Sequence, residues 1–196
     1  MKYPAIEPER LTGAEPLLNA HGEAIGSLLD FWQWAYSDLV GNAERGALAE
    51  YLVACALGIA NTCRISWDRY DLITKEGIAI EVKTSGYIQT WEQESLSKPI
   101  FGIGATLGWN SQTNQYDAVP KRQADIYVFC HHSHTDQATV NPLDVSQWEF
   151  YLLPTKVLNE KLPNQKSVSL TTLKKIGAVS SPYDKLYTSI VSLIQR

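Results

Sequence analysis

The stretch that decides the fold is YDLITKEGIAIEVKTSG, residues 70–86. This stretch predicts a β-hairpin. It begins with a short apolar run, continues through a turn over 75–77, and ends in a second run over 78–84 that is rich in β-branched residues. Gly77 supplies the turn residue that can take a positive φ at no steric cost. Side chains alternate along a strand, so two faces are predicted. One face holds Ile78, Ile80, Val82 and Thr84, and the other holds Ala79, Glu81, Lys83 and Ser85.

An acid and a base therefore point to the same side of a strongly apolar strand. Burial of Glu81 and Lys83 in a sheet is costly unless another group compensates. One register across the hairpin places Asp71 beside Glu81, and neighbouring carboxylates raise each other's pKa unless a cation is present. Hard oxygen ligands suit Mg²⁺ or Mn²⁺. Lys83 would then stand where it could orient or help deprotonate an attacking water, which favours metal-assisted hydrolysis of a phosphodiester.

Asp71, followed across the turn by Glu81-Val82-Lys83, resembles the motif of the PD-(D/E)XK nuclease superfamily. Tyr70 stands where a proline often precedes the aspartate. The resemblance implies that a metal is bound by the carboxylates of Asp71 and Glu81 and by the carbonyl of Val82, and that Lys83 assists the nucleophile. It further implies a Mg²⁺ cofactor, with Mn²⁺ as the alternative, and a nucleic-acid substrate, with cleavage of DNA by an endonuclease favoured.

A helix is predicted over residues 42–58, ended by Gly58. Glu50 lies on its small-residue face, which can pack closely. Two interpretations stay open for this carboxylate. It forms a salt bridge to Arg45 or a half-exposed rim, or it reaches the hairpin site, as the resemblance implies for a glutamate on the helix before the core sheet.

Three residues after the motif are predicted to contact the substrate: Ser85, Tyr87 and Gln89. The resemblance places a site-contacting Gln or Lys near the position of Gln89. Tyr87 could stack on a base, and packing within the protein is the alternative for this aromatic ring.

Flanking segments complete the predicted layout. Residues 61–67 are expected to form a strand that leads into the hairpin, and 124–130 a buried strand. Asp68 competes with Asp71 as a metal ligand, but it resembles a turn residue, so Asp71 is preferred. The histidine-rich run 131–134 is expected to be an exposed loop and not a zinc site.

Length and composition limit the class of protein. The 196 residues, 44% hydrophobic and 19% charged, suit one globular domain. A net charge of −4 is mild evidence against a nucleic-acid binder, although a metal-site nuclease concentrates acids in its site and can keep a local basic rim. The three cysteines are typical of reduced core residues. No signal-peptide-like run or bilayer-spanning segment is evident, so a cytoplasmic protein with no membrane partner is expected.

The predicted fold is α/β, a restriction-endonuclease-like central mixed β-sheet flanked by helices, with extra N- and C-terminal helices. In this single domain, residues 1–20 form an irregular arm, a buried helix spans 22–41, residues 42–153 form the core, and the C-terminal helices occupy 155–196. A homodimer is compatible with this layout. Two alternatives remain: a catalytically silent module that binds nucleic acid or a protein, and an accidental match in which Glu81 and Lys83 form a surface ion pair.

Overall fold

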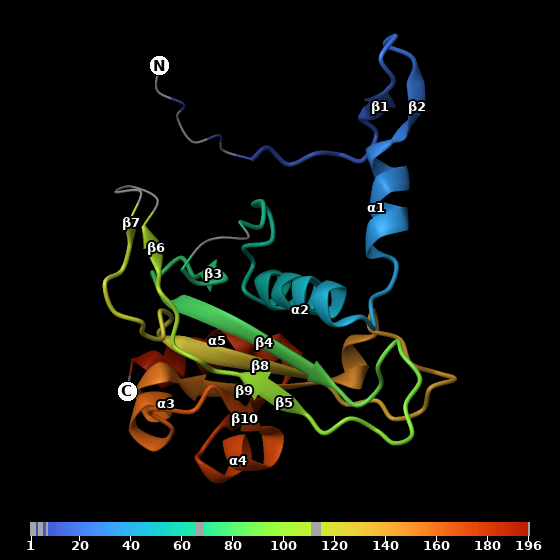
Figure 1. The fold of residues 1–196 in the computed structure, drawn as a ribbon. Coiled ribbons are helices and arrows are strands. Elements are labelled where there is room, and N and C mark those ends of the chain that lie inside the picture. Colours follow the sequence, from blue (N-terminus) through green and yellow to red (C-terminus); the bar gives the residue numbers. More distant parts are fainter. Residues whose placement is uncertain (1–2, 4–5, 7, 66–68, 111–114, 196) are drawn as a thin grey trace.

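The computed structural model describes the chain except for residues 1–2, 4–5, 7, 66–68, 111–114 and 196. In the described part, a five-stranded mixed sheet of order β11-β9-β8-β4-β3 forms the centre (Figure 1). Only β4 and β8 pair in parallel. β8 is buried along its whole length because elements cover it on each face, whereas β4 is apolar on one face and carries Glu81 and Lys83 on the other. The strands are β3 (Leu72–Ile73), β4 (Ala79–Gly86), β8 (Ile126–His132), β9 (Trp148–Pro154) and β11 (Val179–Ser181).

Helices α2 (Asn42–Ala56) and α5 (Leu186–Ile194) cover one face of the sheet. Figure 1 shows α2 lying across β4. Ile80 and Val82 point to this face, as the alternation predicts, and they join the same buried cluster as Leu52 of α2. Packing of α2 on β4 therefore holds the inner face of this helix in a fixed position above the hairpin.

The opposite face is covered by two short helices and a two-stranded ribbon. Phe129 of β8 packs there against Phe101, edge to face at 5.2 Å between ring centroids. The covering elements are α3 (Thr155–Lys161), α4 (Leu170–Lys175), β5 (Ile100–Gly102) and β10 (Ser167–Ser169). A mixed α/β architecture with a central mixed sheet is confirmed.

The predicted hairpin is present. β3 pairs antiparallel with β4 in a register that sets Leu72 opposite Ile80 and Ile73 opposite Ala79. Gly77 has a φ of 84°, and its N–H donates to the carbonyl of Thr74 at 3.0 Å. Glycine is needed at this turn because other residues rarely adopt a positive φ.

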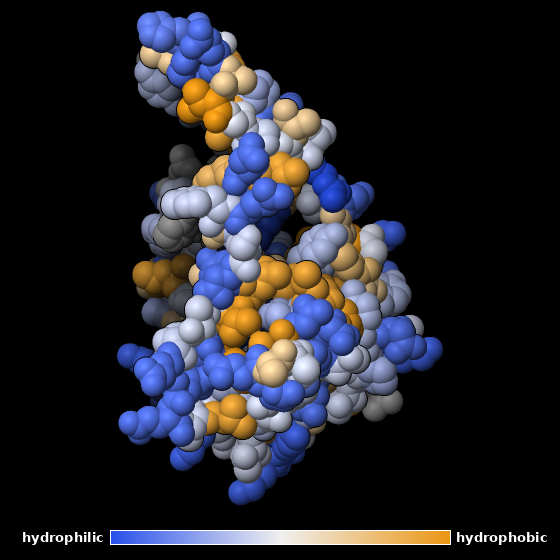
Figure 2. All heavy atoms as spheres, turned by 90° about the vertical axis from the view of Figure 1, so that its right-hand side faces the viewer, coloured by the Kyte–Doolittle hydropathy of each residue, from blue (hydrophilic) through white to orange (hydrophobic). Residues whose placement is uncertain are grey.

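The N-terminal region differs from the prediction. A hairpin of β1 (Pro16–Leu18) and β2 (Ala24–Ser27) precedes α1 (Leu28–Tyr36), so the helix begins six residues later than expected. Ser27 caps it, with Asp30 completing a capping box. The expectation that this helix is buried is wrong, since none of its residues is buried and Trp34 is 86% exposed. Figure 2 shows hydrophobic side chains on the surface of this projecting arm.

Two further expectations need correction. The described part of the predicted strand over 61–67, residues 61–65, is irregular, and residues 66–67 lie outside the described chain. β8 continues two residues past Cys130, so His131 and His132 are buried in the sheet and not in an exposed loop. Burial and the nearby Arg45 guanidinium lower the pKa of His132 to about 4, which keeps its ring neutral at pH 7.

The remaining short elements are β6 (Trp109–Asn110), β7 (Gln115–Tyr116), and the 3-10 turns η1 (Val145–Gln147) and η2 (Tyr183–Lys185). None of the helices in the described ranges is both long and apolar enough to cross a bilayer.

Candidate active site

Asp71 marks the point where the β3–β4 ladder ends. Its backbone N–H donates to the carbonyl of Ile80 at 3.1 Å, the same residue that Leu72 pairs with. Its carboxylate then accepts a hydrogen bond from the N–H of Val82 at 2.7 Å, in place of the next strand contact. Because the N–H and C=O of one strand residue point to the same side, the Val82 carbonyl also faces this open edge.

Glu81 and Lys83 lie two residues apart on the face of β4 opposite to α2. Lys83 Nζ is 2.6 Å from Glu81 Oε1, and the two side chains are 32% and 20% exposed, respectively. The accidental-match alternative requires a solvated surface pair, whereas this pair is half-buried beside Asp71. Burial of both charges makes their interaction stronger than that of an exposed pair.

Glu50 projects from α2 toward the same edge. Its side chain is 12% exposed, and both of its carboxylate oxygens accept hydrogen bonds from the guanidinium of Arg64, from Nε and from Nη2, the latter at 2.8 Å. A salt bridge to Arg45, one of the two interpretations from the sequence, is therefore wrong. Arg45 is itself buried and donates to the backbone carbonyls of Val40 and Ile88.

Two other carboxylates act on Asp71 at this edge. Burial, and then the negative charges of Glu81 and Glu50, raise the pKa of Asp71 to about 7, against the opposing effects of the Val82 N–H and of Lys83. Glu50 is therefore close enough to Asp71 for their charges to interact. The site concentrates negative charge that a cation would stabilise.

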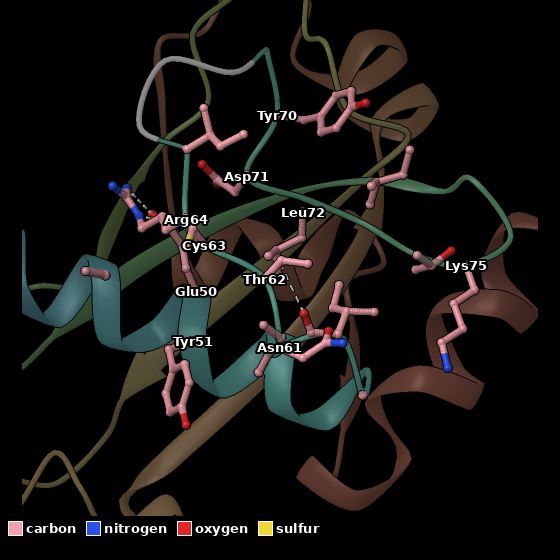
Figure 3. A pocket seen from close by; sticks show the side chains of 18 residues that line it. Glu50, Tyr51, Asn61, Thr62, Cys63, Arg64, Tyr70, Asp71, Leu72 and Lys75 are labelled. Atoms are coloured by element: carbon pink, nitrogen blue, oxygen red, sulfur yellow. Dashed lines mark hydrogen bonds and ion pairs between the residues drawn. The ribbon is translucent and has the colours of Figure 1, made fainter. Parts of the chain in front are cut away.

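A pocket of about 600 Å³ opens beside two of these acids (Figure 3). It lies between α2, the irregular segment 58–65 and the start of the hairpin, and Glu50 and Asp71 line it. Tyr51 and Tyr70 add aromatic surface to its wall. The sheet edge thus offers both charged groups and room for part of a substrate.

The predicted substrate contacts have structural partners. The Ser85 hydroxyl accepts a hydrogen bond from the N–H of Ile100 at 3.2 Å. Gln89 is buried and donates to the carbonyl of Gly86 at 3.0 Å. Tyr87 packs edge to face on His131 at 4.7 Å. The structure does not bring these three side chains to the acids, and a role in substrate binding stays a prediction.

Arg64 is the site residue that the sequence interpretation missed. It lies in the irregular segment and carries no periodic pattern that would connect it with Glu50. A weak signal exists, because Arg64 is the only charged residue in the segment 58–65. Asp68, the competing acid, lies outside the described residues.

Metal ligation requires side chains to move from this arrangement. Across the described ranges, no three His, Cys, Asp or Glu side chains are already grouped as metal ligands. The physical reason is visible in the contacts: Glu50 faces Arg64, and Glu81 faces Lys83. The donor set itself, carboxylates and a backbone carbonyl around an acid with a raised pKa, fits a hard divalent cation.

Comparison with known families bears on this chemistry. The family model of bacteriophage T4 endonuclease IV matches residues 27–172, about three quarters of the chain. The chain belongs to this endonuclease family. The matched range contains α2, the hairpin and the candidate-site residues Glu50, Arg64, Asp71, Glu81 and Lys83, and the prediction of a nuclease is confirmed. A search of curated proteins gave no match.

Proposed function

We propose that the chain is a metal-dependent endonuclease of the PD-(D/E)XK type, with a restriction-endonuclease-like core, that hydrolyses phosphodiester bonds in DNA. One observation carries the proposal. Asp71 lies at the open edge of β4, where burial and then the negative charges of Glu81 and Glu50 raise its pKa to about 7. A buried carboxyl group whose pKa is strongly raised by neighbouring charges is typical of a functional site.

Each residue has a role in this proposal. The carboxylates of Asp71 and Glu81 and the carbonyl of Val82 would hold Mg²⁺ or Mn²⁺, and Glu50 would join them directly or through water. When bound, the cation would supply Lewis-acid stabilisation of the charge that develops on the phosphate. The ammonium of Lys83 lies beside Glu81, where it can donate a hydrogen bond that orients the attacking water.

Cleavage of a mixed panel of DNA and RNA, with Mg²⁺, Mn²⁺ or EDTA, tests this function. We expect hydrolysis of DNA with either metal and none with EDTA. Glu81→Gln should be inactive because it removes a ligand charge. Glu76→Gln is the matched control, since Glu76 lies in the same hairpin but on its exposed turn, where it accepts a hydrogen bond from Tyr187. It should cleave as the wild type does.

Two outcomes would contradict the proposal: undiminished cleavage in EDTA, or wild-type activity in Glu81→Gln. The catalytically silent alternative makes a different prediction for the same panel, namely binding of nucleic acid with no cleavage under any condition.

A further inference from the structure

The two side chains of the Glu50–Arg64 pair differ in their exposure to solvent. Glu50 stands on the packed helix α2 and its side chain is 12% exposed, whereas Arg64 extends from an irregular segment and is 48% exposed. An almost buried carboxylate needs a cation because isolated charge is costly to desolvate. In the ligand-free chain Arg64 supplies that cation, and it is the more exposed of the two side chains.

The guanidinium of Arg64 also interacts with the second acid of the edge. Its positive charge is stabilised first by Glu50 and then, at longer range, by Asp71. Figure 3 shows Arg64 joined to Glu50 by dashed lines, with Asp71 nearby. The guanidinium of Arg64 therefore interacts with Glu50 and Asp71, the same two carboxylates that a bound metal ion would contact.

We propose that Arg64 competes with the metal ion for Glu50, and that metal binding transfers its guanidinium from Glu50 to a phosphate of the substrate. The proposal rests on the metal-dependent function proposed above. A divalent cation held by Glu50 and Asp71 repels the adjacent guanidinium, so the two cannot share these acids. The displaced Arg64 stays in the wall of the pocket beside the acids.

A phosphate is the ligand that suits the displaced group. The planar guanidinium presents paired N–H donors that match phosphate oxygens bidentately, as they match the carboxylate of Glu50 in the free chain. The exchange would thus couple two events: binding of the cation releases Arg64 from Glu50, and the released guanidinium holds the negatively charged substrate.

Calorimetric titration with Mn²⁺ and Mg²⁺ tests whether Arg64 competes with the metal ion for Glu50. Arg64→Gln should bind either metal about tenfold more tightly than the wild type, because the competing cation is gone; this corresponds to 1.4 kcal/mol. Arg69→Gln is the matched control. Arg69 lies five residues away, and its contacts include the carbonyl of Trp109 and Asp117. Its metal affinity should equal that of the wild type.

Salt-dependent binding of a labelled DNA oligonucleotide tests whether the displaced Arg64 contacts a phosphate of the substrate. With Ca²⁺ in place of Mg²⁺, Arg64→Gln should reduce the slope of log Kd against log salt by about one, the signature of one lost phosphate contact. Without metal the slope should be unchanged, since Arg64 then pairs with Glu50. Arg64→Lys should restore most of the slope, which a purely structural role would not predict.

Glu50→Gln provides an independent variant in case Arg64→Gln folds poorly. It should release Arg64 from Glu50 without metal and increase the metal-free slope by about one. Wild type that binds metal while Arg64→Gln binds it no more tightly would overturn the competition and leave the proposed function intact. Absence of metal binding in both proteins would instead overturn the proposed function. An unchanged slope in Ca²⁺ would overturn the phosphate contact.

Discussion

Lys83→Met is expected to slow cleavage by about 10²- to 10⁴-fold, the range typical of a lost acid–base group. The substitution removes the ammonium that lies 2.6 Å from Glu81 and retains an aliphatic stem of similar length. The fold should persist because α2 packs on the opposite face of β4. Metal binding should persist because the carboxylates remain.

Rates of plasmid and oligonucleotide cleavage, measured beside calorimetric metal titration, check this expectation. Lys156→Met is a matched control, since Lys156 is exposed on α3, away from the acids, and loses the same charge. A Lys83→Met protein that binds metal and cleaves within tenfold of the wild-type rate would show that Lys83 takes no part in the reaction.

Asp71→Asn is expected to stabilise the metal-free protein at pH 8 while it abolishes cleavage. Burial first, and then Glu81 and Glu50, raise the pKa of Asp71 to about 7, above its ordinary value of 3.8. A carboxyl group whose pKa is raised by folding costs stability when it is ionised. That cost is absent below about pH 4, grows as the pH rises and is complete above about pH 7.

The asparagine variant should therefore gain about 2 to 4 kcal/mol in free energy of unfolding at pH 8 and almost nothing at pH 4. The amide oxygen can still accept the hydrogen bond from Val82, so the ladder end is preserved. Denaturant titrations at both pH values, in EDTA, measure the difference. Asp184→Asn, at an acid that is 73% exposed, is the control and should change little at either pH.

Adding Mg²⁺ provides a second comparison on the same proteins. It should stabilise the wild type, because the cation removes the repulsion among the acids, and it should stabilise Asp71→Asn much less. If Asp71→Asn is less stable than the wild type at pH 8 without metal, then the ionised carboxylate of Asp71 does not destabilise the folded protein, and the interpretation is contradicted.

The part of the site that the sequence predicted is the part encoded locally. Turn chemistry at Gly77 and strict alternation over 78–84 determine the hairpin, and the hairpin brings Asp71 to Ile80 and Val82, on either side of Glu81. These features need no distant partner, so a single sequence contains them. Glu50 could be nominated from its small neighbours, since close helix packing follows from residue size.

The other features depend on contacts between distant segments. The apolar pattern of α1 identifies a hydrophobic face but not whether any element covers it, and in this fold the helix projects from the body. Residues 61–65 resemble a strand in composition, yet they pair with no strand of the described sheet. Arg64 meets Glu50 only because this segment crosses over α2.

The C-terminal end of β8 also depends on a distant segment. His131 and His132 follow a buried strand and precede a polar loop, so propensity alone gave no reason to extend β8. Their pairing with Ser85 and Gly86 of β4, in a parallel register, explains the extension. The partner strand, and not the local composition, determines where β8 stops.

The central claim is that Asp71 and Glu81 form a divalent-cation site that drives cleavage. Its most direct test is calorimetric titration of Mg²⁺ and Mn²⁺ into wild type and Glu81→Ala, run beside the nucleic-acid panel. We expect the wild type to bind metal and cleave, and Glu81→Ala to lose both in parallel. A wild type that binds neither metal at millimolar concentrations would contradict the account and leave the family's nuclease chemistry to other residues.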